Sequence, residues 1–277
     1  MTILLTGATG KIGRRVGARL RDLDVPVRPA GRGSTPPFDW TDESSWPAAL
    51  DGVRAAFVVP YDGAQLTRPF VAAAIRAGVE RIVLLSGRGV DVPDYLPPEW
   101  MAGNAHVDGE AALRAADVDW TILRPGWFAQ NFSEGFFRDA VLAGELRLPG
   151  GDGAASFVDA EDIAAVAVAA LTEDDHVGST YELSGPRAVT LAEAVAEIAA
   201  ASGRDVRYAH VDHDDFVREL VDQGWAPDDA EGYAVMVSPL RRGIDAYLSD
   251  GVEKVLGRPA RDFRDVVREA AAAGAWS

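Results

Sequence analysis

The sequence predicts an α/β protein in which a doubly wound parallel sheet carries a smaller C-terminal α/β lobe. Three observations indicate this fold class. A short apolar run, Ile3–Thr6, stops at a glycine and is followed by a helical pattern. Strand-like and helix-like segments then alternate with short connections, which is typical of a parallel sheet covered on both faces. The length of 277 residues and a hydrophobic content of 48% allow a large buried core.

The first half of the chain gives the clearest elements. Apolar runs bounded by turn residues predict strands at residues 3–6, 25–30, 55–59, 81–86 and 120–124, with a short further strand at Phe38-Asp39. Helical periodicity predicts helices at residues 11–21, 44–50, 64–77 and 104–116. We expect Ser44 to cap the second of these helices and Gly78 to end the third. Residues 31–37 are rich in glycine and proline and are expected to form a loop.

Shorter elements are expected in the second half. Asp159 is a good cap for a helix at residues 160–171, which lies between strands at 156–158 and 181–184. Thr190 is a good N-cap for a helix that ends near Ala201, before a strand at 206–210 and irregular helical segments. We therefore divide the chain into a domain of residues 1–185 and a smaller mixed lobe of residues 186–277 that closes over the ligand.

Composition excludes several classes of protein. The net charge of −16 disfavours nucleic acid and anionic membranes as partners, because both require a basic face. The absence of cysteine excludes disulfides, thiolate catalysis and cysteine-bound metals. No apolar segment approaches the ~18 residues of a membrane span, and no signal precedes the first strand, so we expect a cytoplasmic protein. The sequence leaves the oligomeric state open.

A glycine-rich turn follows the first expected strand. Gly7 permits the tight turn, Gly10 lets the backbone approach a phosphate, and Gly13 lets the helix pack closely on the strand. The first turn of that helix has unpaired N–H groups at the positive end of the helix dipole. These features favour a dinucleotide site over a purely structural turn. We expect its pyrophosphate to be bound by Gly7, Thr9, Gly10, Lys11, Ile12 and Gly13.

The end of the second expected strand indicates which dinucleotide is bound. In NAD-specific folds a carboxylate about 20 residues after the glycines binds the ribose hydroxyls. Residues 25–38 contain no acid, whereas Arg32 can place a planar guanidinium on a 2′-phosphate, with a hydroxyl from Ser34. An ordinary solvated loop arginine is the alternative. We expect the cofactor to be NADP, with NADPH preferred over NADH.

Three motifs resemble the atypical short-chain dehydrogenase/reductases of the NmrA-like group: Thr6–Gly13, Thr121–Gly126 and Phe157–Ala164. The resemblance extends to near residue 200 and is closest to NAD(P)H-dependent quinone reductases and ergot-alkaloid iminium reductases. It implies a Rossmann-type sheet with ligand at the carboxyl ends of its strands. It also implies that Asp39 faces the adenine amino group, unless Asp39 is a turn residue, and that Pro60, Ser86, Gly87 and Pro125 contact the cofactor.

The catalytic pair usual in that superfamily, Tyr-x-x-x-Lys, is absent from the sequence. The only lysines are Lys11 and Lys254, and neither lies four residues after a tyrosine. By position His106 replaces the tyrosine and Glu110 the lysine. His106 could position a ligand, transfer a proton or have no role, since imidazole titrates near neutrality. Ser86 coincides with the serine that orients a carbonyl in the family, although it could equally form a turn.

Aromatic residues follow the strand that ends near Pro125. Trp127, Phe128 and Asn131, together with Tyr61, are our candidates for a substrate pocket. Phe136 and Phe137 are expected to lie in the core. The stretch His210–Asp215 has the composition of a metal site, but crowded acids after a strand are more typical of a solvated helix cap, and no metal is predicted.

Two functions remain open on the sequence alone. The first is an NAD(P)H-dependent reductase that transfers hydride to a small activated acceptor, a quinone, iminium or enone of aromatic or polycyclic character. The aromatic wall favours this function, and for an iminium we expect nearby carboxylates. The second is a non-catalytic NADP-binding redox sensor that docks on a protein partner, as the NmrA resemblance implies. The missing Tyr–Lys pair favours the sensor.

Overall fold

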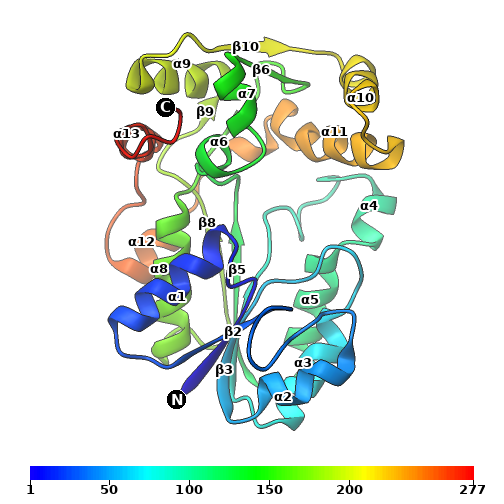
Figure 1. The fold of residues 1–277 in the computed structure, drawn as a ribbon, viewed down its shortest axis with the longest axis vertical. Coiled ribbons are helices and arrows are strands. Elements are labelled where there is room, and N and C mark those ends of the chain that lie inside the picture. The colour runs from blue at the N-terminus through cyan, green and yellow to red at the C-terminus, as the bar shows by residue number, and fades with distance from the viewer.

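The expected parallel sheet is present in the computed structural model, which describes residues 1–277 (Figure 1). Its six strands run in the order β2-β1-β3-β4-β5-β8, and every neighbouring pair is parallel. The strands are β1 (Thr2–Thr6), β2 (Val27–Ala30), β3 (Val53–Val58), β4 (Arg81–Leu85), β5 (Asp119–Pro125) and β8 (Ser179–Leu183). Since all strands point the same way, their carboxyl ends form one edge of the sheet. This edge faces the smaller region drawn above the sheet in Figure 1, which we name the upper lobe.

Helices cover both faces of the sheet (Figure 1). On one face lie α1 (Lys11–Asp22), α8 (Ala160–Thr172) and α12 (Gly251–Leu256), and on the other lie α2 (Trp46–Leu50), α3 (Thr67–Arg76) and α5 (Ala105–Arg114). Helix α1 buries Ile12, Val16 and Leu20, whose spacing of four places them on one side. Helix α8 is buried almost throughout, because α1 and α12 pack on it as well as the sheet. The doubly wound architecture is confirmed.

The strand predicted at Phe38-Asp39 is wrong. Asp39 forms only an isolated bridge with Asp42, and its carboxylate accepts the N–H of Thr41 at 2.9 Å. A carboxylate that satisfies local backbone donors favours a turn over a strand. Strand β2 is therefore the edge of the sheet.

Other predicted boundaries shift because polar side chains cap different residues. Asp42, and not Ser44, accepts the first backbone N–H and begins a 3-10 helix, η1 (Glu43–Ser45), that leads into α2. Helix α3 begins at Thr67, three residues after the predicted start. The predicted cap Asp159 is confirmed, since it accepts the N–H of Glu161 at 3.0 Å. Residues 156–158 form only an isolated bridge, between Val158 and Phe128.

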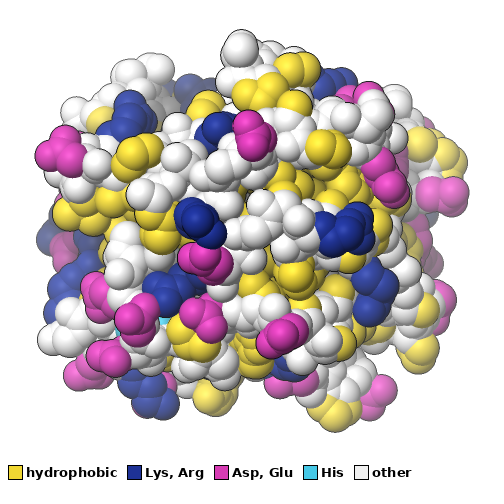
Figure 2. All heavy atoms as spheres, turned by 90° about the horizontal axis from the view of Figure 1, so that it is seen from below, with side chains coloured by type: hydrophobic (Ala, Val, Ile, Leu, Met, Phe, Trp, Pro, Cys, Tyr) yellow, Lys and Arg dark blue, Asp and Glu magenta, His cyan; other side chains and the backbone are white.

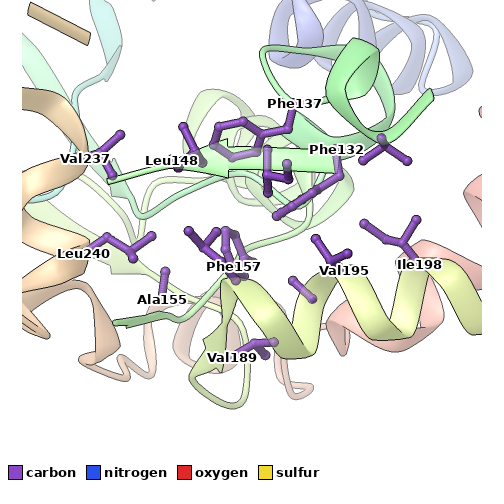
Figure 3. Close-up of a cluster of buried hydrophobic side chains, with 14 of the residues drawn as sticks. Phe132, Phe137, Leu148, Ala155, Phe157, Val189, Val195, Ile198, Val237 and Leu240 are labelled. Atoms are coloured by element: carbon purple, nitrogen blue, oxygen red, sulfur yellow. The ribbon is translucent and has the colours of Figure 1, made fainter. Parts of the chain in front are cut away.

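The upper lobe is built from short elements. Two small sheets pair β10 (Arg207–His210) with β6 (Glu145–Leu148) and β7 (Ala154–Ala155) with β9 (Val189–Thr190). The helices of this region are α4 (Pro98–Ala102), α6 (Asn131–Glu134), α7 (Arg138–Ala143), α9 (Leu191–Ser202), α10 (His213–Asp222), α11 (Pro227–Arg241), η2 (Ile244–Ala246) and α13 (Phe263–Ala272). The core of this region contains Phe132, Phe137 and Phe157, which lie near α9 (Figure 3).

The path of the chain bears on how the two regions are divided. The upper core takes side chains from residues 129–157 as well as from residues 189–276. Conversely, Val252 on α12 packs in the lower core with α8 and β8. The boundary at residue 185 stays a prediction. Each of the two cores takes side chains from both sides of that boundary.

The surface in Figure 2 carries acidic and basic side chains interspersed with apolar and uncharged ones. None of the helices combines the length and apolar character that crossing a bilayer requires.

Candidate functional site

The glycine-rich turn joins β1 to α1. Gly7 has φ +61°, a conformation that favours glycine. A Cβ atom at Gly13 would lie 2.2 Å from the carbonyl oxygen of Gly7, so no side chain fits there. Gly10 is the N-cap of α1, without a side-chain cap and without an acid in the first turn. The first N–H groups of α1 are therefore open to an anion at the carboxyl edge of the sheet.

The other predicted residues of this turn divide by exposure. Thr9 and Gly10 are exposed, whereas Lys11 is half-buried. Ile12 places its side chain in the core beneath α1, at 3% exposure. Only the backbone N–H of Ile12 can therefore serve a ligand, and the prediction for this residue is limited to that group.

A cavity of about 480 Å³ opens on one side of the turn. It lies at the carboxyl ends of β1, β2 and β3 and is lined by Gly7, Ala30, Gly31, Arg32, Phe38, Asp39, Trp40, Thr41, Val59, Pro60, Tyr61, Asp62 and Gly63. The predicted residues Arg32, Asp39 and Pro60 are thus brought together with Gly7. The size and position suit the adenosine half of a dinucleotide.

The charged groups of this adenosine-side cavity differ in how they are engaged. Arg32 is exposed and makes no hydrogen bond or ion pair with the protein, so its guanidinium is available. Asp39 accepts the backbone N–H and the hydroxyl of Thr41, and these bonds lower its pKa. Arg28, by contrast, donates to the carbonyls of Ala49 and Asp51 and is structural. The Ser34 hydroxyl donates within its own loop.

A second cavity, of about 420 Å³, lies where β4 and β5 end beneath the upper lobe. Ser86, Gly87, His106, Pro125, Trp127, Phe128 and Asn131 line it, which unites most of the predicted catalytic and pocket residues. Its remaining lining residues are Lys11, Arg88, Gly89, Val90, Tyr95, Leu96, Met101, Asn104, Gly126, Phe136 and Met236. Lys11 connects this cavity to the glycine turn. We name it the acceptor cavity, after the hydride acceptor that the resemblance implies.

Two aromatic residues lie elsewhere than the sequence suggested. Tyr61 borders the adenosine-side cavity and does not line the acceptor cavity. Phe136 was expected in the core, but it is 61% exposed and lines the acceptor cavity, with its ring 5.2 Å from Nζ of Lys11. Helix α6 ends at Glu134, so the helical periodicity that placed Phe136 inward does not continue. Phe137 is buried as expected.

The aromatic wall is fixed by a carboxylate that sequence reasoning missed. Asp245, in η2, is fully buried and accepts the indole N–H of Trp127 at 2.8 Å and the hydroxyl of Tyr95 at 2.7 Å. Burial raises the pKa of Asp245, although these hydrogen bonds oppose the shift. Burial, followed by the charge of Asp245, also raises the pKa of Tyr95. Tyr95 therefore keeps its proton, which is donated to Asp245.

Glu110, which the resemblance places where the family's lysine would fall, is an ion-paired glutamate. Glu110 is 1% exposed and receives a bidentate pair from Arg124, at 2.8 and 2.7 Å. Arg114 donates to the same carboxylate at 2.6 Å. Burial would raise the pKa of Glu110, but the donors around it outweigh burial and lower it. Glu110 is therefore ionised, and its ion pair with Arg124 links α5 to β5.

Ser86 belongs to the same network. Its hydroxyl donates to Glu110 at 2.6 Å, and the side chain is 3% exposed. A hydroxyl has one proton, so Ser86 can only accept a hydrogen bond from a ligand while this bond is kept. Its predicted role in orienting a carbonyl stays a prediction, and it requires that Ser86 release Glu110.

His106 lies in the first turn of α5, held by the side chain of Asn104, which accepts its backbone N–H at 2.9 Å. The ring packs against Gly87, and its Nδ1 is buried without a partner. Burial lowers the pKa of His106, against the charges of Asp62 and Glu110. His106 makes no hydrogen bond with Glu110, because Ser86, Arg114 and Arg124 take the oxygens of that carboxylate. The lowered pKa favours the neutral imidazole, which is ill suited to supply a proton as an imidazolium.

The side chains of His210 and His213 have different hydrogen-bond partners. His210 Nδ1 accepts the N–H of Gly151 at 3.1 Å, whereas the His213 ring bonds the carboxylate of Glu231 at 3.0 Å. Each ring is thus engaged by a different part of the upper lobe.

Comparison with known proteins agrees with this geometry. A family model described as NAD(P)H-binding matches residues 7–174. A (4-alkanoyl-5-oxo-2,5-dihydrofuran-3-yl)methyl phosphate reductase of Streptomyces griseus is 36% identical, over 95% of each chain. An NAD(P)H azoreductase of Xenophilus azovorans is 33% identical over 98% of each chain. The NADPH complex of an Escherichia coli quinone oxidoreductase superposes with a TM-score of 0.81 at 26% identity, covering 96% of this chain and 99% of that one.

Proposed function

The chain belongs to the NAD(P)H-binding family of atypical, NmrA-like short-chain dehydrogenase/reductases and is an oxidoreductase, and from that premise we propose that it passes hydride from NADPH to a quinone, enone or iminium. The observation that carries the proposal is the glycine turn between two cavities, of which the second has an aromatic wall. The similarity to named reductases favours the enzyme over the redox sensor.

The residues present fit a dinucleotide. The side-chain-free turn at Gly7 and Gly10 leaves the space that a Cβ would fill, and the open N–H groups of α1 suit a pyrophosphate. Arg32 would hold the 2′-phosphate and Asp39 the adenine. Bound NADPH supplies a hydride from its nicotinamide ring. Gly87 and Pro125, at the ends of β4 and β5, border the space for that ring.

The chain's own contribution is to position the acceptor and exclude water. Trp127, fixed by Asp245 and stacked on Phe137 at 5.9 Å, offers a flat apolar face beside Phe128. Met236 of α11 and Met101 of α4 cover the cavity from the lobe side. A planar, conjugated acceptor suits this enclosure. No acid lines the cavity, so the carboxylates expected beside an iminium are absent from its wall, and quinones and enones are the better supported acceptors.

A panel of acceptors tests the proposed chemistry. Reduction of a ketone needs a proton in the transition state, and a site without a general acid forfeits about 10²–10⁴-fold in rate. A quinone or enone instead spreads the incoming charge by conjugation. We expect NADPH to be consumed faster with a naphthoquinone or an enone than with a matched ketone. A clear preference for the ketone would contradict the proposal and would require a proton donor in the cavity.

Replacement of His106 distinguishes positioning from proton transfer. Because burial lowers its pKa and so favours the neutral imidazole, we expect His106→Ala to lower kcat with a quinone by less than about tenfold, below the usual range for loss of a general acid. Steady-state rates across pH 5–9 would measure the effect. Turnover eliminated by the substitution, or a pH profile that loses one ionisation, would instead identify His106 as the proton donor.

Arg32 decides between the two nicotinamide cofactors. We expect Arg32→Ala to weaken NADPH binding by about 1–3 kcal/mol, the size of a charge-assisted hydrogen bond, and to leave NADH almost unchanged. Arg28→Ala is a matched control, because its guanidinium is engaged by backbone carbonyls. Calorimetry on both variants measures the effect. Equal losses for NADPH and NADH in Arg32→Ala would refute the assignment.

A further inference from the structure

The charge of the acceptor cavity is opposite to that of the protein. The chain has 43 acidic and 27 basic side chains. The cavity nevertheless is lined by two cationic side chains, Lys11 and Arg88, and by no aspartate or glutamate. The wall on which a substrate would rest is therefore positive, and the field inside a partly enclosed cavity is screened less than at the surface.

Arg88 has hydrogen-bonding capacity that the protein does not use. Its Nη1 donates to the Ser156 hydroxyl at 2.9 Å and to the Asp245 carbonyl at 3.0 Å. The ring of Tyr247 lies 5.7 Å from the guanidinium carbon, and Gly126 allows the fork to lie close to the backbone at the end of β5. Nε and Nη2 are shielded from water and have no acceptor. The guanidinium is thus held in place while two of its nitrogens lack partners.

The acids near this cavity are engaged by other groups. Asp245 accepts from Tyr95 and Trp127, on the far side of the aromatic wall. Glu134, which acts electrostatically on Lys11, is paired with Arg14 and Arg15 instead. The amine of Lys11 lies over Gly135 and the ring of Phe136 without an ion-pair partner. Neither cation of the cavity therefore forms an ion pair with a carboxylate side chain, although Asp245 and Glu182 act electrostatically on Arg88.

We propose that the acceptor carries an anionic oxygen group, a carboxylate, sulfonate or phosphate, and that the guanidinium of Arg88, which lines the cavity, binds this group. A planar guanidinium matches two oxygens of such a group, and within the protein its Nε and Nη2 have no acceptor. Lys11 adds charge but also serves the cofactor's pyrophosphate, so specificity rests on Arg88. This inference depends on the proposed function only in assigning the cavity to the acceptor.

The test compares two ligands that differ in charge at one substituent. Anthraquinone-2-sulfonate and anthraquinone-2-sulfonamide are titrated calorimetrically into the NADP⁺ complex of the wild type, Arg88→Gln and Arg88→Lys. We expect the wild type to bind the sulfonate at least about tenfold more tightly than the sulfonamide, and Arg88→Gln to weaken the sulfonate by about 10–100-fold, as for a hydrogen-bonded charge. The sulfonamide should change by less than about threefold, and Arg88→Lys should restore part of the sulfonate affinity.

Arg242→Gln separates recognition from a structural role. Arg242 donates to the carbonyls of Asp94 and Tyr95, so it anchors the loop after β4 that also carries Arg88. Arg242 does not line the cavity. Its loss should leave the preference for the sulfonate unchanged. The inference would be overturned if Arg88→Gln weakened the binding of both ligands equally or of neither. It would also be overturned if the wild type bound neither ligand. A sulfonate that binds through Arg88 but is not reduced by NADPH would instead refute the proposed quinone reduction and leave the anion site standing.

Discussion

Replacement of Gly10 by valine is expected to weaken NADPH and NADH binding alike by more than about 100-fold, at least as much as the loss of a strong charge-assisted hydrogen bond. A Cβ at this position would already lie 3.2 Å from the carbonyl oxygen of Gly7, and the valine methyl groups would fill the space above the turn. Gly10 is exposed and has φ −73°, which valine tolerates, so the fold should persist. Fluorescence titration of both nucleotides measures the loss.

Gly103→Val provides the control for this experiment. A Cβ at Gly103 would meet no atom within 4 Å, and Gly103 lines neither cavity. Both variants should melt close to the wild-type temperature, and only Gly10→Val should lose cofactor. Wild-type affinity in Gly10→Val would show that the dinucleotide binds elsewhere.

Removal of Glu110 is expected to cost about 3–5 kcal/mol of unfolding free energy, the usual size when one partner of a buried ion pair is lost. Glu110→Ala removes the bidentate acceptor of Arg124, which is 5% exposed and keeps only the contacts of its Nη1 with Asp91 and Glu182, and leaves the Ser86 hydroxyl without its acceptor. Glu80→Ala is the matched control, because Glu80 pairs with Arg54 on the surface with 67% of its side chain exposed. That variant should lose no more than about 1 kcal/mol in urea unfolding.

Acid should remove the difference between wild type and Glu110→Ala. The pKa of Glu110 is lowered in the folded state, so its stabilising contribution is complete above its ordinary pKa of about 4.3 and is lost as pH falls below it. Two results would contradict this role of Glu110. One is a loss of unfolding free energy in Glu110→Ala no larger than in Glu80→Ala, and the other is a loss that does not shrink in acid.

The sequence predicted well the elements whose signals are local. The apolar runs that became β1, β3, β4 and β5 and the four-residue spacing of buried residues on α1 depend on neighbours in the chain. The glycine turn is predictable for the same reason, since its geometry follows from three residues within seven positions. At Phe38-Asp39 local side-chain hydrogen bonds overrode the strand propensity, and the prediction failed.

The second cavity could be predicted only in part. Trp127, Phe128 and Asn131 follow directly after a strand, which marks them as site residues. Tyr95 and Asp245 are separated by 150 positions, and Trp127 and Asp245 by 118. Neither Tyr95 nor Asp245 belongs to a periodic pattern, so their contact arises from how the upper lobe packs. Arg88 was missed because an arginine in a loop is ordinarily solvated, and only the cavity reveals its unused nitrogens.

The central claim is that the acceptor cavity supports hydride transfer to a conjugated acceptor, and a single-turnover experiment tests it most directly. The NADPH complex is mixed with 1,4-naphthoquinone in a stopped-flow instrument, and the absorbance of the reduced nicotinamide is followed. We predict that the absorbance falls in one turnover, with one NADPH oxidised per quinone reduced, and that Gly10→Val shows no such phase. Unchanged absorbance in a wild-type complex to which the quinone has bound would contradict the claim and favour a redox sensor.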